Sequence, residues 1–125
     1  MMLDTNALSA WADGDVALLR VLPKDRLWHL PVVVLGEFLY GIRRSRERPK
    51  LERWMDAVKA SCALVVVDDD TADHYATLRE ELRAAATPIP ENDIWIAALC
   101  RQHHLPLASR DAHFDHVRGL KRVTW

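Results

Sequence analysis

Short apolar runs alternate along the chain with longer segments in which apolar residues recur at helical spacing. This alternation is typical of parallel strands joined by crossover helices. The sequence therefore predicts an α/β protein with a central, mainly parallel sheet of four to five strands. We expect these strands at residues 1–3, 27–30, 63–67, 107–109 and 121–124.

Helices are predicted between the strands, at residues 6–11, 31 to about 45, 50–60, 68 to about 87, and 91 to about 103. Pro31 and Pro49 suit the starts of the second and third helices. An acid or Thr71 can cap the fourth helix, whose inward side we assign to Ala72, Tyr75, Ala76, Leu82 and Ala86. The fifth is apolar nearly all round, which predicts burial between the sheet and another surface, such as a partner subunit.

The composition limits the class of protein. The chain has 125 residues, half of them hydrophobic, and a net charge of -1, which fits one globular domain covering residues 1–125. Cys62 and Cys100 lie far apart without C-x-x-C spacing, which favours reduced thiols in a cytoplasmic protein. No apolar run approaches the length of a membrane span and no signal segment is evident, so we expect a soluble protein.

Four acids lie beside apolar segments, where an ionised side chain is unfavourable unless it has a partner. Glu37 lies within the apolar run at residues 32–42, Asp4 follows Leu3, Asp93 opens the apolar stretch at residues 94–99, and Asp111 follows the predicted strand at residues 107–109. Ligands of open parallel sheets bind beyond the carboxyl ends of the strands, where the strand order reverses. We therefore expect the four acids to share one site.

Each acid also has an ordinary explanation. Asp4 could cap the first helix, Asn92-Asp93 before an apolar helix has the pattern of a cap, and Asp111 could be a turn residue. Glu37 could extend to solvent and pair with an arginine. These alternatives remain open at the level of sequence.

A shared site would have a definite chemistry. Hard divalent cations such as Mg²⁺ prefer oxygen ligands and are commonly held by one or two carboxylates together with substrate phosphate. The cation offsets the repulsion among the acids, activates water and stabilises charge on a phosphodiester under attack. Hydrolysis of nucleic acid by a metal-bound carboxylate cluster is the resulting hypothesis.

Four motifs carry a family resemblance: Leu3-Asp4-Thr5-Asn6, Val34 to Gly41, Ile89 to Ala98, and Ser109 to Phe114. In order and content they resemble the PIN-domain ribonucleases, and closely the VapC-type toxins of toxin–antitoxin modules, over nearly the whole chain. The resemblance implies a three-layer α/β/α fold and a Mg²⁺- or Mn²⁺-dependent endoribonuclease. It also implies a protein that is usually a homodimer and is held inactive by an antitoxin.

The resemblance also assigns roles to individual residues. Asp4, Glu37, Asp93 and Asp111 match the family's catalytic acids, with Asp4, Asp93 and Asp111 as metal ligands and Glu37 as a ligand or a water-orienting base. Asn6 and Ser109 match supporting polar residues. Many relatives have a second acid where this chain has His113, so one hypothesis is that a single metal binds firmly and a second binds only with RNA.

A basic stretch follows the second predicted helix. Arg43, Arg44 and Arg46 belong to it, and they could contact RNA phosphates beside the acids without reading base sequence. A solvated helix end and loop is the alternative explanation.

Three other functions compete with the nuclease hypothesis. A zinc site formed by His113-x-x-His116 and nearby acids lacks the Cys/His pairs of a structural zinc module. A receiver-like phospho-acceptor domain could use Asp68 to Asp70, but no acid pair follows the first strand and no Lys-Pro follows the fifth. A PIN-like binding module without catalysis is disfavoured because all four acids are retained.

Overall fold

The computed structural model describes all 125 residues and contains a five-stranded sheet in the order β3-β2-β1-β4-β5. Every neighbouring pair of strands is parallel. The strands are short: β1 (Met2–Leu3), β2 (His29–Pro31), β3 (Ala63–Val65), β4 (Leu107–Ala108) and β5 (Arg122–Val123). The predicted α/β class and all five strands are confirmed, although each strand is shorter than expected.

Strand β1 lies in the middle of the sheet, with β2 on one side and β4 on the other. The chain first passes from β1 to β2 and later returns to the opposite edge of β1 as β4, so strand order reverses between β1 and β4. The backbone N–H of Asp4 donates to the carbonyl of Ala108 at 3.1 Å, which holds the carboxyl ends of these two strands together. A ligand site is expected at such a point.

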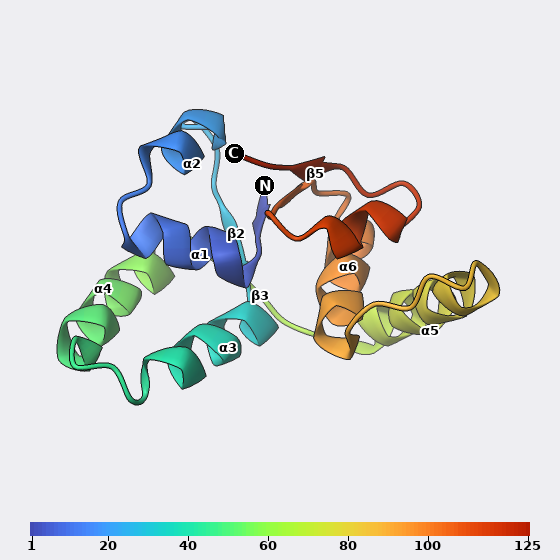
Figure 1. Cartoon of the computed structure of the whole chain (residues 1–125), viewed down its shortest axis with the longest axis horizontal. Coiled ribbons are helices and arrows are strands. Elements are labelled where there is room, and N and C mark those ends of the chain that lie inside the picture. The colour runs from blue at the N-terminus through green and yellow to red at the C-terminus, as the bar shows by residue number, and fades with distance from the viewer.

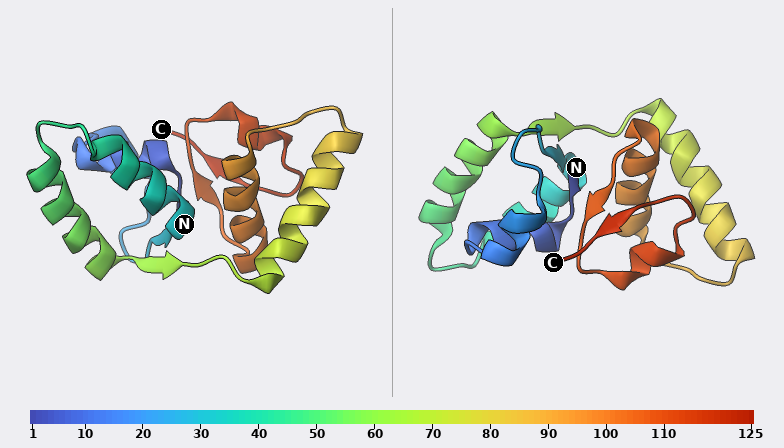
Figure 2. Two further views of the ribbon diagram at one scale, coloured as in Figure 1. Left: turned by 90° about the horizontal axis from the view of Figure 1, so that it is seen from below. Right: turned by 90° about the horizontal axis from the view of Figure 1, so that it is seen from above.

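Six α-helices and one 3-10 helix surround the sheet (Figure 1). They are α1 (Thr5–Ala12), α2 (Val16–Val21), α3 (Val32–Ile42), α4 (Arg48–Ser61), α5 (Asp69–Ala84), α6 (Glu91–His103) and the 3-10 helix η1 (Ala112–His116). In Figure 1, α1 to α4 lie to the left of β1, whereas α5 and α6 lie to the right. Figure 2 shows the segment with β3 crossing between these two groups, from α4 to α5.

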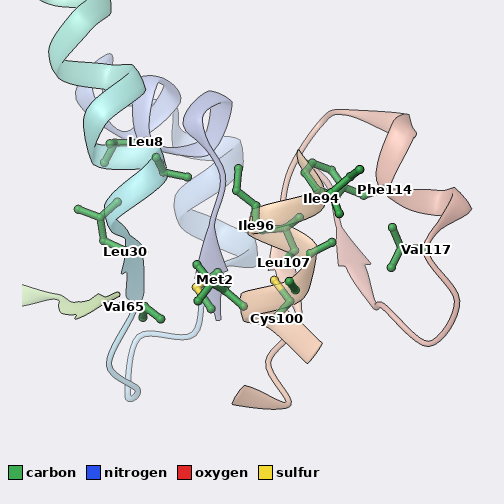
Figure 3. Packing of buried hydrophobic residues seen from close by; sticks show 14 of the residues in the cluster. Met2, Leu8, Leu30, Val65, Ile94, Ile96, Cys100, Leu107, Phe114 and Val117 are labelled. Carbon is green, nitrogen blue, oxygen red and sulfur yellow. The ribbon is translucent and has the colours of Figure 1, made fainter. Parts of the chain in front are cut away.

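Two hydrophobic clusters lie on opposite faces of the sheet. Met2 and Leu107, both labelled in Figure 3, belong to a cluster of 21 buried residues. This cluster also includes residues of α3 to α6. Their strand neighbours Leu3 and Ala108 belong to a second cluster, with α1 and α2. Because successive strand residues point to opposite faces, the sheet is the middle layer of a three-layer α/β/α fold.

Local sequence signals explain where the helices begin and end. Asp68 and Thr71 form a capping box at the start of α5, which satisfies backbone N–H groups that have no partner within the helix. Pro49 lies in the first turn of α4, where its missing N–H is not needed. His104 caps the C-terminus of α6, and its φ of 53° places it in the left-handed region.

The predicted inward side of α5 is partly wrong. Leu82 is buried and Tyr75 half-buried, but Ala72, Ala76 and Ala86 are exposed. Alanine is small enough for either environment, so its spacing locates the buried face poorly. The fully buried or nearly buried positions of α5 are Thr71, Leu78 and Leu82.

Two further expectations need correction. The helix predicted to reach about residue 45 ends at Ile42, before the arginine-rich turn. The short helix α2 was not predicted at all, because among its six residues only Leu18 is buried and no repeating apolar face develops.

The prediction of a deeply buried α6 is confirmed, since six of its residues lie in the core. None of the helices combines the length and the apolar character that crossing a bilayer requires.

Candidate metal centre

The four acids that the sequence singled out line one open cleft with a volume of about 530 Å³. Asp4 directly follows β1, Glu37 lies in α3, Asp93 lies in the first turn of α6, and Asp111 follows β4. Four elements thus bring together side chains separated by up to 107 positions (111 minus 4). The cleft lies beyond the carboxyl ends of β1 and β4, where the reversal of strand order predicts a site.

Asp4 is the most buried of the four, with 5% of its surface exposed. One carboxylate oxygen accepts from the Thr5 backbone N–H at 2.7 Å, and the other accepts from Asn6 Nδ2 at 2.9 Å and Ser109 Oγ at 2.6 Å. Burial raises the pKa of Asp4, while the Ser109 hydrogen bond opposes this and Glu37 and Asp111 add to it. Asp4 therefore caps α1, as one sequence interpretation proposed, and also faces the cleft.

Asn6 and Ser109 form the support of Asp4. Asn6 Nδ2 also lies 3.2 Å from Ser109 Oγ, and Asn6 Oδ1 accepts the Arg110 backbone N–H at 3.0 Å. Ser109 is completely buried, and its hydroxyl accepts the Asp111 backbone N–H at 2.9 Å. The two side chains thus tie the start of α1 to the loop after β4 and fix the orientation of the Asp4 carboxylate.

Glu37 has two neutral hydrogen-bond partners and no arginine, so the alternative of a Glu37–arginine pair is wrong. Thr5 Oγ1 donates to Oε2, and Asn92 Nδ2 donates to Oε1 at 2.7 Å. The side chain is half-buried and extends from α3 into the cleft. Two hydrogen bonds hold the Glu37 carboxylate in place. No arginine or lysine forms an ion pair with it.

Asp93 has no hydrogen-bond donor on either carboxylate oxygen, although its side chain is only 15% exposed. It does not cap α6: the N-cap is Pro90, no side-chain cap bond exists, and the capping interpretation is wrong. Burial raises the pKa of Asp93 to about 6, with the charges of Asp4 and Asp111 adding to the rise and His113 opposing it. A half-buried carboxylate without a donor is the feature of this cleft that most clearly calls for a cation.

Asp111 begins the 3-10 helix η1 and accepts the His113 backbone N–H at 2.9 Å, so the turn interpretation is also correct. Its carboxylate lies 3.1 Å from His113 Nδ1, and the same nitrogen lies 3.7 Å from the Asp93 carboxylate. One ligand atom from each of Asp93, Asp111 and His113 lies within 4.8 Å of the others. Asp4 and Glu37 line the same cleft outside this group of three.

The donor set fits a hard divalent cation. An ionised carboxylate offers about four lone pairs, and hydrogen bonds use three of those on Asp4. Asp93 accepts no hydrogen bond, and only one oxygen of Asp111 accepts one, so most of their lone pairs are free. Oxygen donors from two or three carboxylates with room for water match what Mg²⁺ or Mn²⁺ requires.

The competing sites do not assemble. His116 lies outside the metal-ligating group, and Asp115 is paired with Arg122 at 2.8 Å, so the zinc site based on His113-x-x-His116 is wrong. Asp68 accepts from Thr71 and Gln102 at the start of α5 and does not line the cleft. The receiver-like interpretation is wrong as well, because Asp68 caps the start of α5.

Arg110 is a cation of the cleft that was not predicted from the sequence. Its guanidinium pairs with Asp15 at 2.9 Å and lies 4.6 Å from the ring centre of Trp125. The only signal was its place between Ser109 and Asp111, which we treated as a turn. Arg110 is the single arginine or lysine lining the cleft.

The predicted RNA-contact arginines lie elsewhere. Arg43, Arg44 and Arg46 follow α3, are exposed and form no ion pair. A second groove of about 280 Å³ shares Thr5 and Glu37 with the acidic cleft and continues between α1 and α3 to Gly41 and Ile42. The three arginines therefore follow the far end of a groove that starts at the acids.

A carboxylate cleft at the carboxyl edge of a parallel sheet defines a class of α/β proteins suited to a divalent cation. The family model described as PIN domain matches residues 1–120. The chain belongs to the PIN domain family.

Individual relatives agree with this assignment. The chain is 30% identical to Ribonuclease VapC5 of Mycobacterium tuberculosis, over 98% of its own length and 90% of that protein. It matches the structure of VapBC-5 from the same organism with a TM-score of 0.75 at 28% identity, covering 98% of this chain and 94% of that one. VapBC2 from Rickettsia felis, bound to a promoter DNA fragment, has a TM-score of 0.87 at 22% identity, covering 99% and 97%.

Proposed function

We propose that residues 1–125 form a single PIN domain that acts as a metal-dependent endoribonuclease, the toxin of a toxin–antitoxin pair. The observation that carries the proposal is the convergence of Asp4, Glu37, Asp93 and Asp111 on one cleft. The relatives named Ribonuclease VapC support RNA as the substrate. The proposed reaction is hydrolysis of a phosphodiester bond.

Asp4, Asp93 and Asp111 would hold Mg²⁺ or Mn²⁺. Such a cation supplies positive charge for a phosphodiester and activates water for attack on phosphorus. Asn6 and Ser109 hold the Asp4 carboxylate in one orientation, which limits the reorganisation that substrate binding requires. Glu37, held by Thr5 and Asn92, faces the same cleft and can orient a water molecule or accept its proton.

RNA would enter along the groove between α1 and α3. Arg110, which lines the acidic cleft and is paired with Asp15, and the exposed Arg43, Arg44 and Arg46, which follow Ile42, would provide positive charge near the two ends of this groove. Contacts from these side chains to phosphates position a strand without specifying its bases. The cleft itself carries more acids than cations, so without a bound metal it repels RNA.

The protein partners follow from the same relatives. Solved neighbours include VapBC complexes, and one is described as a toxin–antitoxin complex from Klebsiella pneumoniae. We infer that this chain binds a cognate antitoxin and forms a homodimer.

The test is cleavage of labelled tRNA and rRNA by the purified protein, freed of any antitoxin, in Mg²⁺ or Mn²⁺. We expect cuts that require the metal and that Asp4→Asn reduces at least about 100-fold, a loss typical of removing one electrostatic catalytic group. Asp56→Asn is the matched control, because it removes the same charge from an exposed position on α4. Binding of RNA without cleavage would instead support a non-catalytic module.

A further inference from the structure

His113 is the imidazole that lies within reach of the acidic cleft. It extends from η1, its side chain is 53% exposed, and Nδ1 lies 3.1 Å from Asp111 Oδ1 and 3.7 Å from Asp93 Oδ2. Two ligands on opposite sides of one Mg²⁺ or Mn²⁺ lie about 4.2 Å apart, since each bond is about 2.1 Å long. Both measured separations fall within that span.

We propose that His113 is a nitrogen ligand of the divalent cation held by Asp93 and Asp111. The inference rests on the proposed function, because it concerns the same metal centre. Three observations carry it: the donor atoms of the three residues lie within 4.8 Å of one another, Asp93 has no hydrogen-bond donor, and no lysine or arginine forms an ion pair with either acid. His113 also occupies the position at which many relatives have a second acid.

A nitrogen ligand changes which metal the site prefers. Mg²⁺ favours oxygen ligands and near-ideal octahedral geometry, whereas imidazole suits transition metals. A site in which an imidazole joins the carboxylates therefore prefers Mn²⁺ over Mg²⁺ more strongly than a site with carboxylates alone. His113 also carries no negative charge when it coordinates, so it adds less repulsion to the cluster than an acid would.

The alternative is that His113 is a counter-ion rather than a ligand. A protonated imidazole between Asp93 and Asp111 would balance their charge only while the metal is absent, and would move away when a cation binds. The two arrangements differ in one measurable property. Only a ligand brings a nitrogen nucleus into direct contact with the metal.

The experiment uses the 125-residue chain with Mn²⁺ and no RNA. Pulsed electron paramagnetic resonance of the bound Mn²⁺ should show coupling to a ¹⁴N nucleus, and His113→Ala should abolish the coupling while Mn²⁺ still binds the carboxylates. His116→Ala is the matched control, since His116 lies on the same 3-10 helix but outside the group of ligand atoms. Its spectrum should equal that of the wild type.

A second readout is the ratio of Mn²⁺ to Mg²⁺ affinity, measured by calorimetry. His113→Asp should lower this ratio, because it replaces the nitrogen ligand by an oxygen ligand. Bound Mn²⁺ without ¹⁴N coupling, together with an unchanged ratio, would overturn the role of His113 but leave the nuclease intact. Failure of the protein to bind either metal would overturn the proposed function as well.

Discussion

Asp4 and Asp93 show how two identical side chains in one cleft acquire different properties. Asp4 is more buried, yet three donors stabilise its ionised form. Asp93 accepts no hydrogen bond, and its ionised form is disfavoured by burial and by the charges of Asp4 and Asp111. Without a metal, Asp93 is therefore the acid whose ionisation weakens the fold most clearly.

This difference predicts a pH effect on stability. The pKa of Asp93 is about 6 in the folded protein against an ordinary value of 3.8, so between these pH values the folded state holds more protons than the unfolded state. The contribution of Asp93 to the free energy of unfolding therefore falls as pH rises through this range. At about 1.4 kcal/mol per pKa unit, the whole rise corresponds to about 3 kcal/mol. Solvent screening of this half-buried group reduces the effect, so we expect the free energy of unfolding to fall by about 1 kcal/mol.

Urea denaturation between pH 4 and 7.5, with a chelator present, measures this effect. Asp93→Asn should have a flatter pH profile than the wild type and should be the more stable protein at pH 7. Asp25→Asn, an exposed position outside the cleft, should leave the profile unchanged. Parallel profiles for wild type and Asp93→Asn would contradict the environment described for this carboxylate.

At the scale of elements, the site depends on where short strands end. β1 and β4 have two residues each, and their ends are followed by Asp4 and by the Ser109 to Asp111 loop. The sequence could predict this much because apolar runs mark strands, and acids that follow such runs must lie at one edge of a parallel sheet. Burial of α6 was equally predictable, since its apolar residues occupy nearly every face.

Contacts that depend on side-chain direction could not be predicted. The apolar run around Glu37 indicated that this acid needs a partner, but not that Thr5 and Asn92 provide it. Sequence spacing does not show that α1 and α6 both present a neutral donor to α3. Arg110 was missed for the same reason, because Asp15 and Trp125, which hold it, lie 95 and 15 positions away in sequence (110 minus 15, and 125 minus 110).

The turn after α3 yields a prediction about RNA binding. Replacing Arg43, Arg44 and Arg46 by alanine should weaken binding of a non-cleavable RNA and reduce the slope of log affinity against log salt. The slope should change by about 0.7 for each single-strand phosphate that the variant no longer neutralises. Because the three side chains form no ion pair within the protein, the substitutions should leave folding unchanged.

A second set of three cations provides the control. Arg20, Lys24 and Arg26 are exposed and do not line either part of the groove. Replacing them by alanine makes the same change in net charge. If both triple variants reduce the salt slope equally, overall charge attracts RNA and the arginines after α3 have no special role.

At the scale of the molecule, the proposed metal site forms only when the fold is complete. Its acids follow two strands and lie on two helices, and all four line one cleft. An unfolded chain separates them and cannot bind one cation with all of them. Metal binding and folding are therefore coupled, because a ligand that binds only the folded state stabilises it.

This coupling predicts that Mn²⁺ raises the free energy of unfolding by about 2.7 kcal/mol at a concentration 100-fold above its dissociation constant. Thermal or urea denaturation with and without Mn²⁺, on the protein used for calorimetry, measures the gain. Asp93→Asn should lose most of it, because the variant removes the carboxylate that has no other partner, whereas Asp56→Asn should retain it. A gain equal in wild type and Asp93→Asn would place the bound metal outside the acidic cleft.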